Sequence, residues 1–143
     1  MIESSQKKSF ACANAALEKK ATDIVLLKMK GILSYADYFL ICGGRSDRHV
    51  QAIAQSIETE LKKQGHRALG VEGANQGRWI LLDYGDVVVH IFQESVRGFY
   101  DLEGLWIDAP RVDIENDQVT GKGKKRKKKE YDRETAKAGS PRN

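Results

Sequence analysis

A glycine-rich turn is the first place in this sequence where residue types and spacing could do chemistry. The run Gly43-Gly44-Arg45-Ser46-Asp47 follows an apolar stretch and precedes a helical pattern. Free backbone N–H groups and a helix dipole at such a place can hold a phosphate. Neither the GxGxxG spacing nor the P-loop spacing is present, so the pattern favours a turn with an N-cap residue over a phosphate site.

Transfer chemistry would need more than this turn. A nucleotidyltransferase uses a close pair of carboxylates on a following strand to hold two metal ions. Asp83 and Asp86 instead flank a tight hairpin, and no Asp-x-Asp or Asp-x-Glu lies on a strand leading from the glycine turn. The sequence therefore disfavours a nucleotidyltransferase and predicts no metal site.

The histidines and cysteines form no catalytic arrangement either. His49, His66 and His90 have no Ser or Cys nucleophile in a familiar arrangement. His90 lies inside a β-branched run and is interpreted as a hydrogen-bonded core or rim residue. Cys12 and Cys42 lack a ligand partner at metal spacing, which predicts core thiols in a reducing compartment. We expect no catalytic residue and no cofactor.

The elements that position these residues follow from the spacing of apolar side chains. A helical pattern covers residues 5–20, and apolar runs at residues 23–27 and 38–42 predict two strands. The connection between these strands looks too short for a helix, so they should pair antiparallel. A second helix should begin at Ser46 or Asp47 as N-cap and end before Gly65; its apolar positions are Val50, Ile53, Ala54, Ile57 and Leu61.

Three further strands complete the expected sheet. They are predicted at residues 67–72, 78–83 and 86–92, and Tyr84-Gly85 leaves room only for a tight hairpin between the last two. Residues 94–104 should form a short helix or two turns. The pattern as a whole predicts an α/β domain with a mixed five-stranded sheet and flanking helices.

Charge divides the chain into two parts. Residues 1–118 carry 14 Lys and Arg against 17 Asp and Glu, a net charge of −3, whereas residues 119–143 carry 10 against 3, a net charge of +7. We expect a folded domain over residues 1–115 and a basic tail over residues 116–143, which has too few apolar side chains to order by itself. Such a tail suits RNA phosphates, or it serves only as a solubilising segment. Its candidate RNA contacts are Lys124, Lys125, Arg126, Lys127, Lys128 and Lys129.

The beginning of the chain carries no targeting signal. It contains Glu3 and Glu18 and lacks an apolar block, so it matches neither a signal peptide nor an Arg-rich transit peptide. No stretch approaches the length of a membrane span. We expect a cytoplasmic protein.

Aromatic side chains among acids are the best indication of a binding function. Tyr and Trp commonly anchor protein interfaces, and acidic neighbours suit a basic protein partner. Phe39, Phe92 and Phe99 are assigned to the core. The other candidates stand at strand starts, at the hairpin tip and in the last helix: Tyr35, Tyr38, Trp79, Tyr84, Tyr100 and Trp106.

Several motifs, in order, resemble the ribosomal silencing factor family, RsfS or Iojap. The resemblance covers about residues 8 to 112. It is carried by Ala36-Asp37-Tyr38-Phe39, residues 46–54, Val71-Glu72-Gly73, Gly77-Arg78-Trp79, residues 83–90, residues 99–103 and Leu105-Trp106. The resemblance implies a mixed sheet with helices, similar to nucleotidyltransferases but without their catalytic carboxylates.

The same resemblance implies a function. Family members bind ribosomal protein L fourteen on the large subunit, block association with the small subunit and repress translation when nutrients are scarce. Two alternatives stay open, a general RNA-binding module and a cryptic nucleotidyltransferase, as do rRNA contact by the tail and a homodimer of the free protein. The predicted partner contacts are Asp37, Tyr38, Glu72, Gly73, Gly77, Trp79, Asp83, Tyr84, Tyr100, Asp101, Leu102 and Trp106.

Overall fold

The structure is a computed structural model that describes residues 4–114 of the 143. The helices and strands of the described residues belong to the first compact unit of the chain, which ends at Val112. The predicted RNA-contacting cations, residues 124–129, lie outside the described residues. The division into a domain of residues 1–115 and a tail of residues 116–143 therefore stays a prediction.

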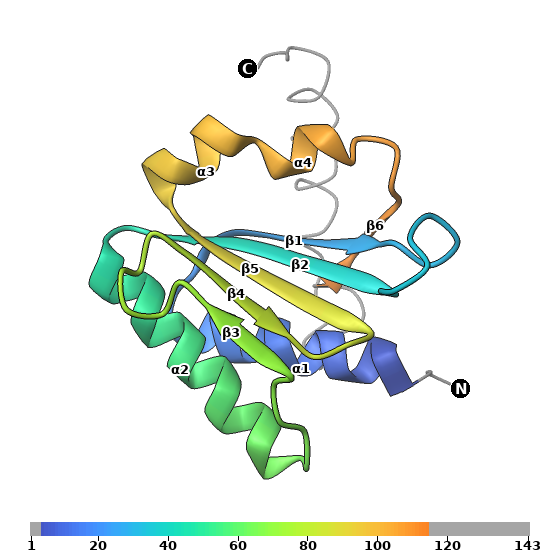
Figure 1. Cartoon of the computed structure of the whole chain (residues 1–143), viewed down its shortest axis with the longest axis horizontal. Coiled ribbons are helices and arrows are strands. Elements are labelled where there is room, and N and C mark those ends of the chain that lie inside the picture. The colour runs from blue at the N-terminus through green and yellow to red at the C-terminus, as the bar shows by residue number, and fades with distance from the viewer. Residues whose placement is uncertain (1–3, 115–143) are drawn as a thin grey trace. The chain divides into compact units, whose positions relative to one another are not determined.

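One mixed sheet forms the middle layer of the fold (Figure 1). Its six strands are β1 (Thr22–Lys28), β2 (Tyr38–Gly44), β3 (Gly70–Glu72), β4 (Trp79–Asp83), β5 (Val87–Gln93) and β6 (Arg111–Val112), in the order β3-β4-β5-β2-β1-β6. The strands β2 and β5 pair in parallel, and the other neighbours pair antiparallel. The prediction of a mixed α/β fold is confirmed.

The sheet has one strand more than the five expected. Strand β6 has only two residues, and its Val112 and Arg111 pair with Leu26 and Leu27 of β1. A segment this short shows no alternation of apolar and polar residues, so sequence periodicity cannot reveal it. Strand β3 begins at Gly70, three residues later than predicted.

Two helices cover each face of the sheet (Figure 1). Helices α1 (Ser4–Glu18) and α2 (Asp47–Lys63) lie on one face, and α3 (Glu94–Tyr100) and α4 (Leu102–Leu105) lie on the other. Because both faces are covered, β2 is buried along its whole length and β5 along all but its last residue. The segment predicted at residues 94–104 is two helices, since Asp101 takes a left-handed conformation with φ of 46°.

Helix α2 begins and ends as its sequence predicts. The Ser46 side chain accepts a hydrogen bond from the backbone N–H of His49 at 3.1 Å, which caps the first turn. Gly65, just beyond the helix, has φ of +90°, a conformation that favours glycine. The predicted apolar positions of this helix are all buried.

Both cysteines are buried core residues, as predicted. Burial raises the pKa of Cys12 and of Cys42 to about 12, so both thiols stay protonated near neutral pH. Phe39 and Phe92 are also buried, but the assignment of Phe99 to the core is wrong, because its side chain is 81% exposed. In α3, Val96 packs on the core and Tyr100 on Trp79, which leaves Phe99 toward solvent.

Candidate protein-interaction surface

A cluster of aromatic rings lies on the sheet face that α3 and α4 cover. Trp79 of β4 pairs with Phe92 of β5, so the two side chains point to the same face. Their ring centroids are 4.8 Å apart. On the neighbouring strands, the rings of Phe39 and His90 are 5.0 Å apart. The rings of Trp79 and His90 are 6.0 Å apart, so four rings from three central strands form a continuous aromatic platform.

The two helices add rings from above. Tyr100 of α3 lies 4.9 Å from Trp79, and Trp106, just after α4, lies 6.2 Å from Phe39 at 90°. Val96 and Leu102 pack against the same core cluster. The helices thus rest on the platform through their inner sides, while Phe99 and Leu105 project outward with 81% and 70% of their area exposed.

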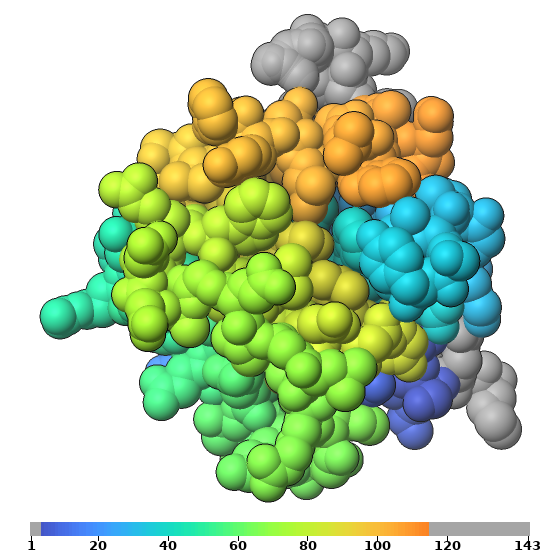
Figure 2. All heavy atoms as spheres, in the orientation of Figure 1, coloured from blue at the N-terminus to red at the C-terminus, as the bar shows by residue number. Residues whose placement is uncertain are grey.

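An open groove of about 520 Å³ lies where the β3–β4 loop meets α3. Figure 2 shows these two segments side by side. We call it the aromatic groove; it is lined by Gly73, Gln76, Arg78, Trp79, Ser95, Val96, Phe99 and Tyr100. Trp79 is only half-buried, so the groove exposes the edge of the platform.

His90 is the polar centre of the platform. The Trp79 indole N–H donates to His90 Nδ1 at 3.2 Å, which leaves the ring proton on Nε2. Nε2 is buried, and no group in the described part of the chain pairs with it. Burial lowers the pKa of His90 to about 4, so the ring is neutral near pH 7. The prediction of a hydrogen-bonded core or rim histidine is confirmed.

Acidic side chains stand around these rings. Glu72 of β3 pairs with Leu81 of β4, which places both on the face that carries Trp79. Asp83, two residues further along β4, accepts a hydrogen bond from the Gly85 N–H at 2.8 Å and so shapes the β4–β5 turn. Asp101 accepts from the Gly104 N–H at 3.2 Å in the turn between α3 and α4.

The fold therefore gathers most of the predicted contacts on one face. Asp37 immediately precedes β2, and its N–H donates to the Asp86 carbonyl oxygen beside the β4–β5 turn. The residues that the structure brings to the aromatic face or its rim are Glu72, Gly73, Trp79, Asp83, Tyr100, Asp101, Leu102 and Trp106.

Two predicted contacts are core residues instead. Tyr38 is 2% exposed and Tyr84 is 5% exposed, so neither side chain is offered to a partner. Tyr38 precedes Phe39 in the same strand, and strand alternation sends it to the opposite face of the sheet. Burial raises the pKa of Tyr84. The sequence pattern misleads here because an aromatic residue at a strand end looks the same whether it is buried or exposed.

The two predicted loop glycines have a conformational role. Gly73 and Gly77 have φ of +80° and +74°. A Cβ on Gly73 would overlap the carbonyl oxygen of Trp79, and one on Gly77 would overlap that of Asp47. Gly77 is buried, and the Gln51 side chain donates to two carbonyl oxygens of this loop, at 2.9 and 3.1 Å. Gly77 therefore lets the loop lie against α2, and Gly73 lets it lie against Trp79.

Residues 43–47 form a turn that ends in an N-cap residue, which is the interpretation that the sequence favours over a phosphate site. Besides the Ser46 cap, the Arg45 N–H donates to His49 Nδ1 at 3.0 Å. His49 Nε2 then donates to the Lys19 carbonyl oxygen at 2.7 Å, so the imidazole fills the turn and ties it to the end of α1. This arrangement uses the turn's polar groups internally and disfavours the phosphate alternative.

Nothing in the described residues forms a metal centre. Asp83 serves the hairpin, and Asp86 pairs with Lys8 of α1 at 2.8 Å. Within residues 4–114, no group of three or more His, Cys, Asp or Glu side chains could hold a metal ion. Within the same residues, no helix is both long and apolar enough to span a membrane.

Sequence reasoning misses several residues of this face. It gives no role to Arg97 of α3 or to Leu105 and Ile107 further along the chain, and it assigns Phe99 to the core. Leu105 and Ile107 are 70% and 55% exposed. A signal is available: residues 96–107 carry apolar side chains on more sides than a short helix can bury against one sheet.

The chain is similar to known proteins of one family. The model of a family described as "Ribosomal silencing factor during starvation" matches residues 2–140, further than the 8 to 112 inferred from motifs. The chain is 50% identical over 102 residues to ribosomal silencing factor RsfS of Halalkalibacterium halodurans, covering 71% of this chain and 87% of the relative. Identity to the Bacillus subtilis protein of the same name is 48%, covering 77% and 94%.

A solved structure has the same fold. A crystal structure of a Chromobacterium violaceum protein superposes with a TM-score of 0.71 at 36% identity, covering 73% of this chain and 87% of that one.

Proposed function

This chain belongs to the ribosomal silencing factor family, and we propose that it docks on the large ribosomal subunit through the aromatic face described above. The family consists of ribosome-binding factors rather than enzymes, and this chain is a ribosomal silencing factor that represses translation by binding the large subunit. The observation that carries this function is the family match over residues 2–140.

The partner on the large subunit is ribosomal protein L fourteen. A domain seated there blocks the small subunit sterically, so subunits cannot join and translation falls when nutrients are scarce. The chemistry of the face suits this partner class: aromatic rings supply the anchors, and acids at the rim complement a basic ribosomal protein. No step of this mechanism needs a metal, a cofactor or a chemical reaction.

We choose the proposed contacts by the exposure of their side chains. Trp79 and Tyr100 line the aromatic groove, and Tyr100 is 53% exposed. Tyr38 and Tyr84 support the sheet from inside. The side chains that we assign to the partner are Asp37, Glu72, Trp79, Asp83, Tyr100, Asp101, Leu102 and Trp106, and Gly73 and Gly77 shape the loop beside them.

We place the protein in the cytoplasm and assign two further properties to the whole chain. The basic tail, residues 116–143, adds sequence-independent contact with rRNA through Lys124 to Lys129. In the free protein, a second copy covers exposed apolar residues such as Phe99 and Leu105, which would otherwise face water. Sedimentation equilibrium tests the second idea, because a strict monomer up to high concentration contradicts a dimer.

The decisive experiment is sedimentation of the purified protein with isolated ribosomal subunits at near-physiological salt. We expect migration with the large subunit alone, and fewer joined ribosomes when both subunits are added. Binding to both subunits and to unrelated structured RNA would favour a general RNA-binding module. Failure to bind the large subunit would overturn the proposal.

A further inference from the structure

The segment formed by α3 and α4 carries much of the proposed surface yet has little buried structure of its own. Neither helix contains a buried residue. Its apolar contacts with the sheet come from Val96, Tyr100, Leu102 and the neighbouring Trp106. Polar contacts must therefore contribute to keeping the two helices in place.

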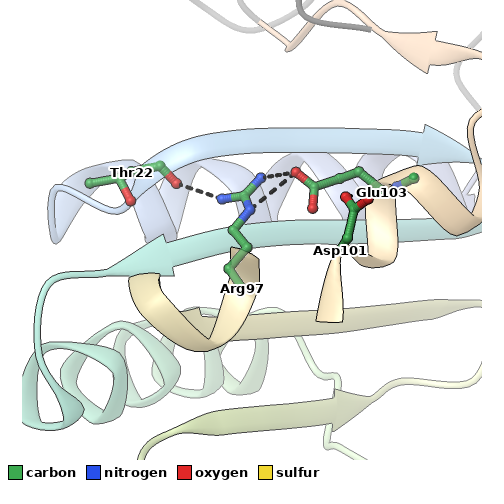
Figure 3. Close-up of polar contacts among 5 residues, drawn as sticks. Thr22, Arg97, Asp101 and Glu103 are labelled. Carbon is green, nitrogen blue, oxygen red and sulfur yellow. Dashed lines mark hydrogen bonds and ion pairs between the residues drawn. The ribbon is translucent and has the colours of Figure 1, made fainter. Parts of the chain in front are cut away.

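One side chain makes most of those polar contacts. Arg97 of α3 donates from Nε and Nη2 to Glu103 Oε2, at 3.1 and 2.7 Å. Its Nη1 donates to the carbonyl oxygen of Thr22 at 3.3 Å. Figure 3 shows the guanidinium between α4 and the start of β1. A single planar group thus connects α3, α4 and the sheet.

The surroundings make these contacts strong. The side chains of Arg97 and Glu103 are only 11% and 21% exposed, so water screens the ion pair weakly. A Cβ on Gly43 of β2 would lie 3.5 Å from Arg97 Nη1 and 2.7 Å from Thr22 Oγ1. The guanidinium therefore packs close to the Gly43 backbone, and a larger residue at this position would collide first with the Thr22 hydroxyl.

Asp101 fixes the turn between α3 and α4. Asp101 accepts from the Gly104 N–H while in a left-handed conformation, and a Cβ on Gly104 would overlap the Asp101 carboxylate. Asp101 sets the bend between α3 and α4, and Arg97 sets where the bent pair rests on the sheet.

We propose that Arg97 is a positioning residue for ribosome binding: it holds α3 and α4 so that Tyr100 and Trp106 face the partner together. This inference rests on the proposed function, in which those side chains contact the large subunit. Arg97 itself is too buried to be a main contact. Its effect on affinity comes through the placement of its neighbours.

The test compares Arg97→Lys with the wild type. Lysine keeps the charge but has a compact ammonium, which cannot reach Glu103 and Thr22 as the planar fork does. We expect faster amide hydrogen exchange in residues 97–106 with unchanged exchange in β2 and β5, and about tenfold weaker binding to large subunits. Arg48→Lys, at an exposed site on α2, is the matched control and should change neither measurement.

A double-mutant cycle separates positioning from a general loss of stability. If Arg97 acts through Tyr100, then Tyr100→Ala costs less affinity in the Arg97→Lys background than in the wild type. Additive effects would overturn the inference. So would unchanged exchange in residues 97–106, or faster exchange there with full affinity.

A second pair of variants guards against a folding defect. Glu103→Gln still accepts a hydrogen bond and should retain most of the affinity, whereas Glu103→Ala should repeat the effect of Arg97→Lys. Equal effects of the two Glu103 variants would contradict the geometry. If the wild-type protein does not bind large subunits at all, the proposed function fails, whereas hydrogen exchange in the free protein still tests whether Arg97 holds the two helices.

Discussion

Trp79 contacts both parts of the proposed surface. Its ring lies 4.8 Å from Phe92 of the platform and 4.9 Å from Tyr100 of α3, and its N–H donates to buried His90. A half-buried tryptophan with partners on a rigid sheet can dock without losing much side-chain entropy. Such a residue is a typical interface anchor.

Replacing this anchor should weaken ribosome binding more than it weakens the fold. We expect Trp79→Ala to lower the affinity for large subunits by about 2 kcal/mol or more, measured by titration with labelled protein. Leu69→Ala is the control, because Leu69 is 77% exposed and does not line the aromatic groove. A Trp79→Ala protein with native circular dichroism and wild-type affinity would remove Trp79 from the interface.

His90 should make the fold sensitive to acid. Burial lowers the pKa of this ring in the folded protein to about 4, against 6.5 for an exposed histidine. Between these values the unfolded chain binds a proton that the folded protein does not, so stability is complete above about pH 6.5 and falls as the pH drops toward 4. The shift corresponds to about 3 kcal/mol at most.

Urea unfolding from pH 7.5 to pH 4.5 tests this prediction. His90→Gln keeps an acceptor for Trp79 but cannot titrate, so its stability should depend less on pH than that of the wild type. The sign distinguishes the cause: a histidine held in its charged form would stabilise the fold at low pH instead. Parallel pH curves for the two proteins would show that other groups dominate.

Residue types alone separate anchors from core residues only in part. The sequence predicts Trp79, Tyr100 and the acids of the rim as contacts because aromatic and acidic residues are interleaved there, and the structure leaves Trp79 and Tyr100 partly exposed. It cannot separate Tyr38 from Trp79, since both lie at the beginning of a strand and only the neighbouring layer decides which one is buried. Arg97 escapes sequence reasoning because a lone arginine in a short helix looks like an ordinary solvated residue.

At the scale of elements, the β3–β4 loop is the part most sensitive to substitution. Gly77 is buried with a positive φ, and a Cβ there would overlap the carbonyl oxygen of Asp47. We expect Gly77→Ala to destabilise the fold by about 1 to 3 kcal/mol and to lower affinity by displacing the groove wall. Chemical denaturation and large-subunit titration measure the two effects.

Gly70→Ala provides the matched control for this prediction. Gly70 begins β3, its φ is negative or extended, and a Cβ there meets nothing within 4 Å. The substitution should be nearly neutral. If both glycine variants lose the same stability, the loop conformation is not the cause.

The elements themselves follow closely from the sequence where local signals agree. Helix α2 shows an N-cap at Ser46, a glycine beyond its end and an apolar stripe. Between β4 and β5 the connection is so short that only a tight hairpin can join the two strands. The two-residue strand β6 and the break at Asp101 depend on pairing and packing with distant residues. A single sequence carries no local signal for either feature.

At the scale of the whole chain, the tail should affect affinity through charge alone. Deletion of residues 119–143 removes a net charge of +7 and should flatten the dependence of large-subunit binding on salt. Each phosphate that the protein no longer neutralises lowers the slope of the double-logarithmic plot by about 0.7 to 0.9. Binding measured from low to physiological salt gives the slopes of the full-length and the shortened protein.

A variant with residues 124–129 changed to Gln controls for chain length. It should show the same reduced slope as the deletion, because the tail is proposed to act by neutralising phosphates. A tail that is only solubilising predicts instead that all three proteins share one slope.

The segment of α3 and α4 is attached to the sheet at both ends. It leaves the sheet directly after β5 and returns as β6, which pairs with β1. A segment held at both ends in this way has little freedom to move away from the sheet before a partner binds. We therefore expect the factor to meet the ribosome already in its binding shape, so that the extent of silencing follows the number of copies in the cell. Control would then act on the synthesis and degradation of the protein, with no conformational trigger required.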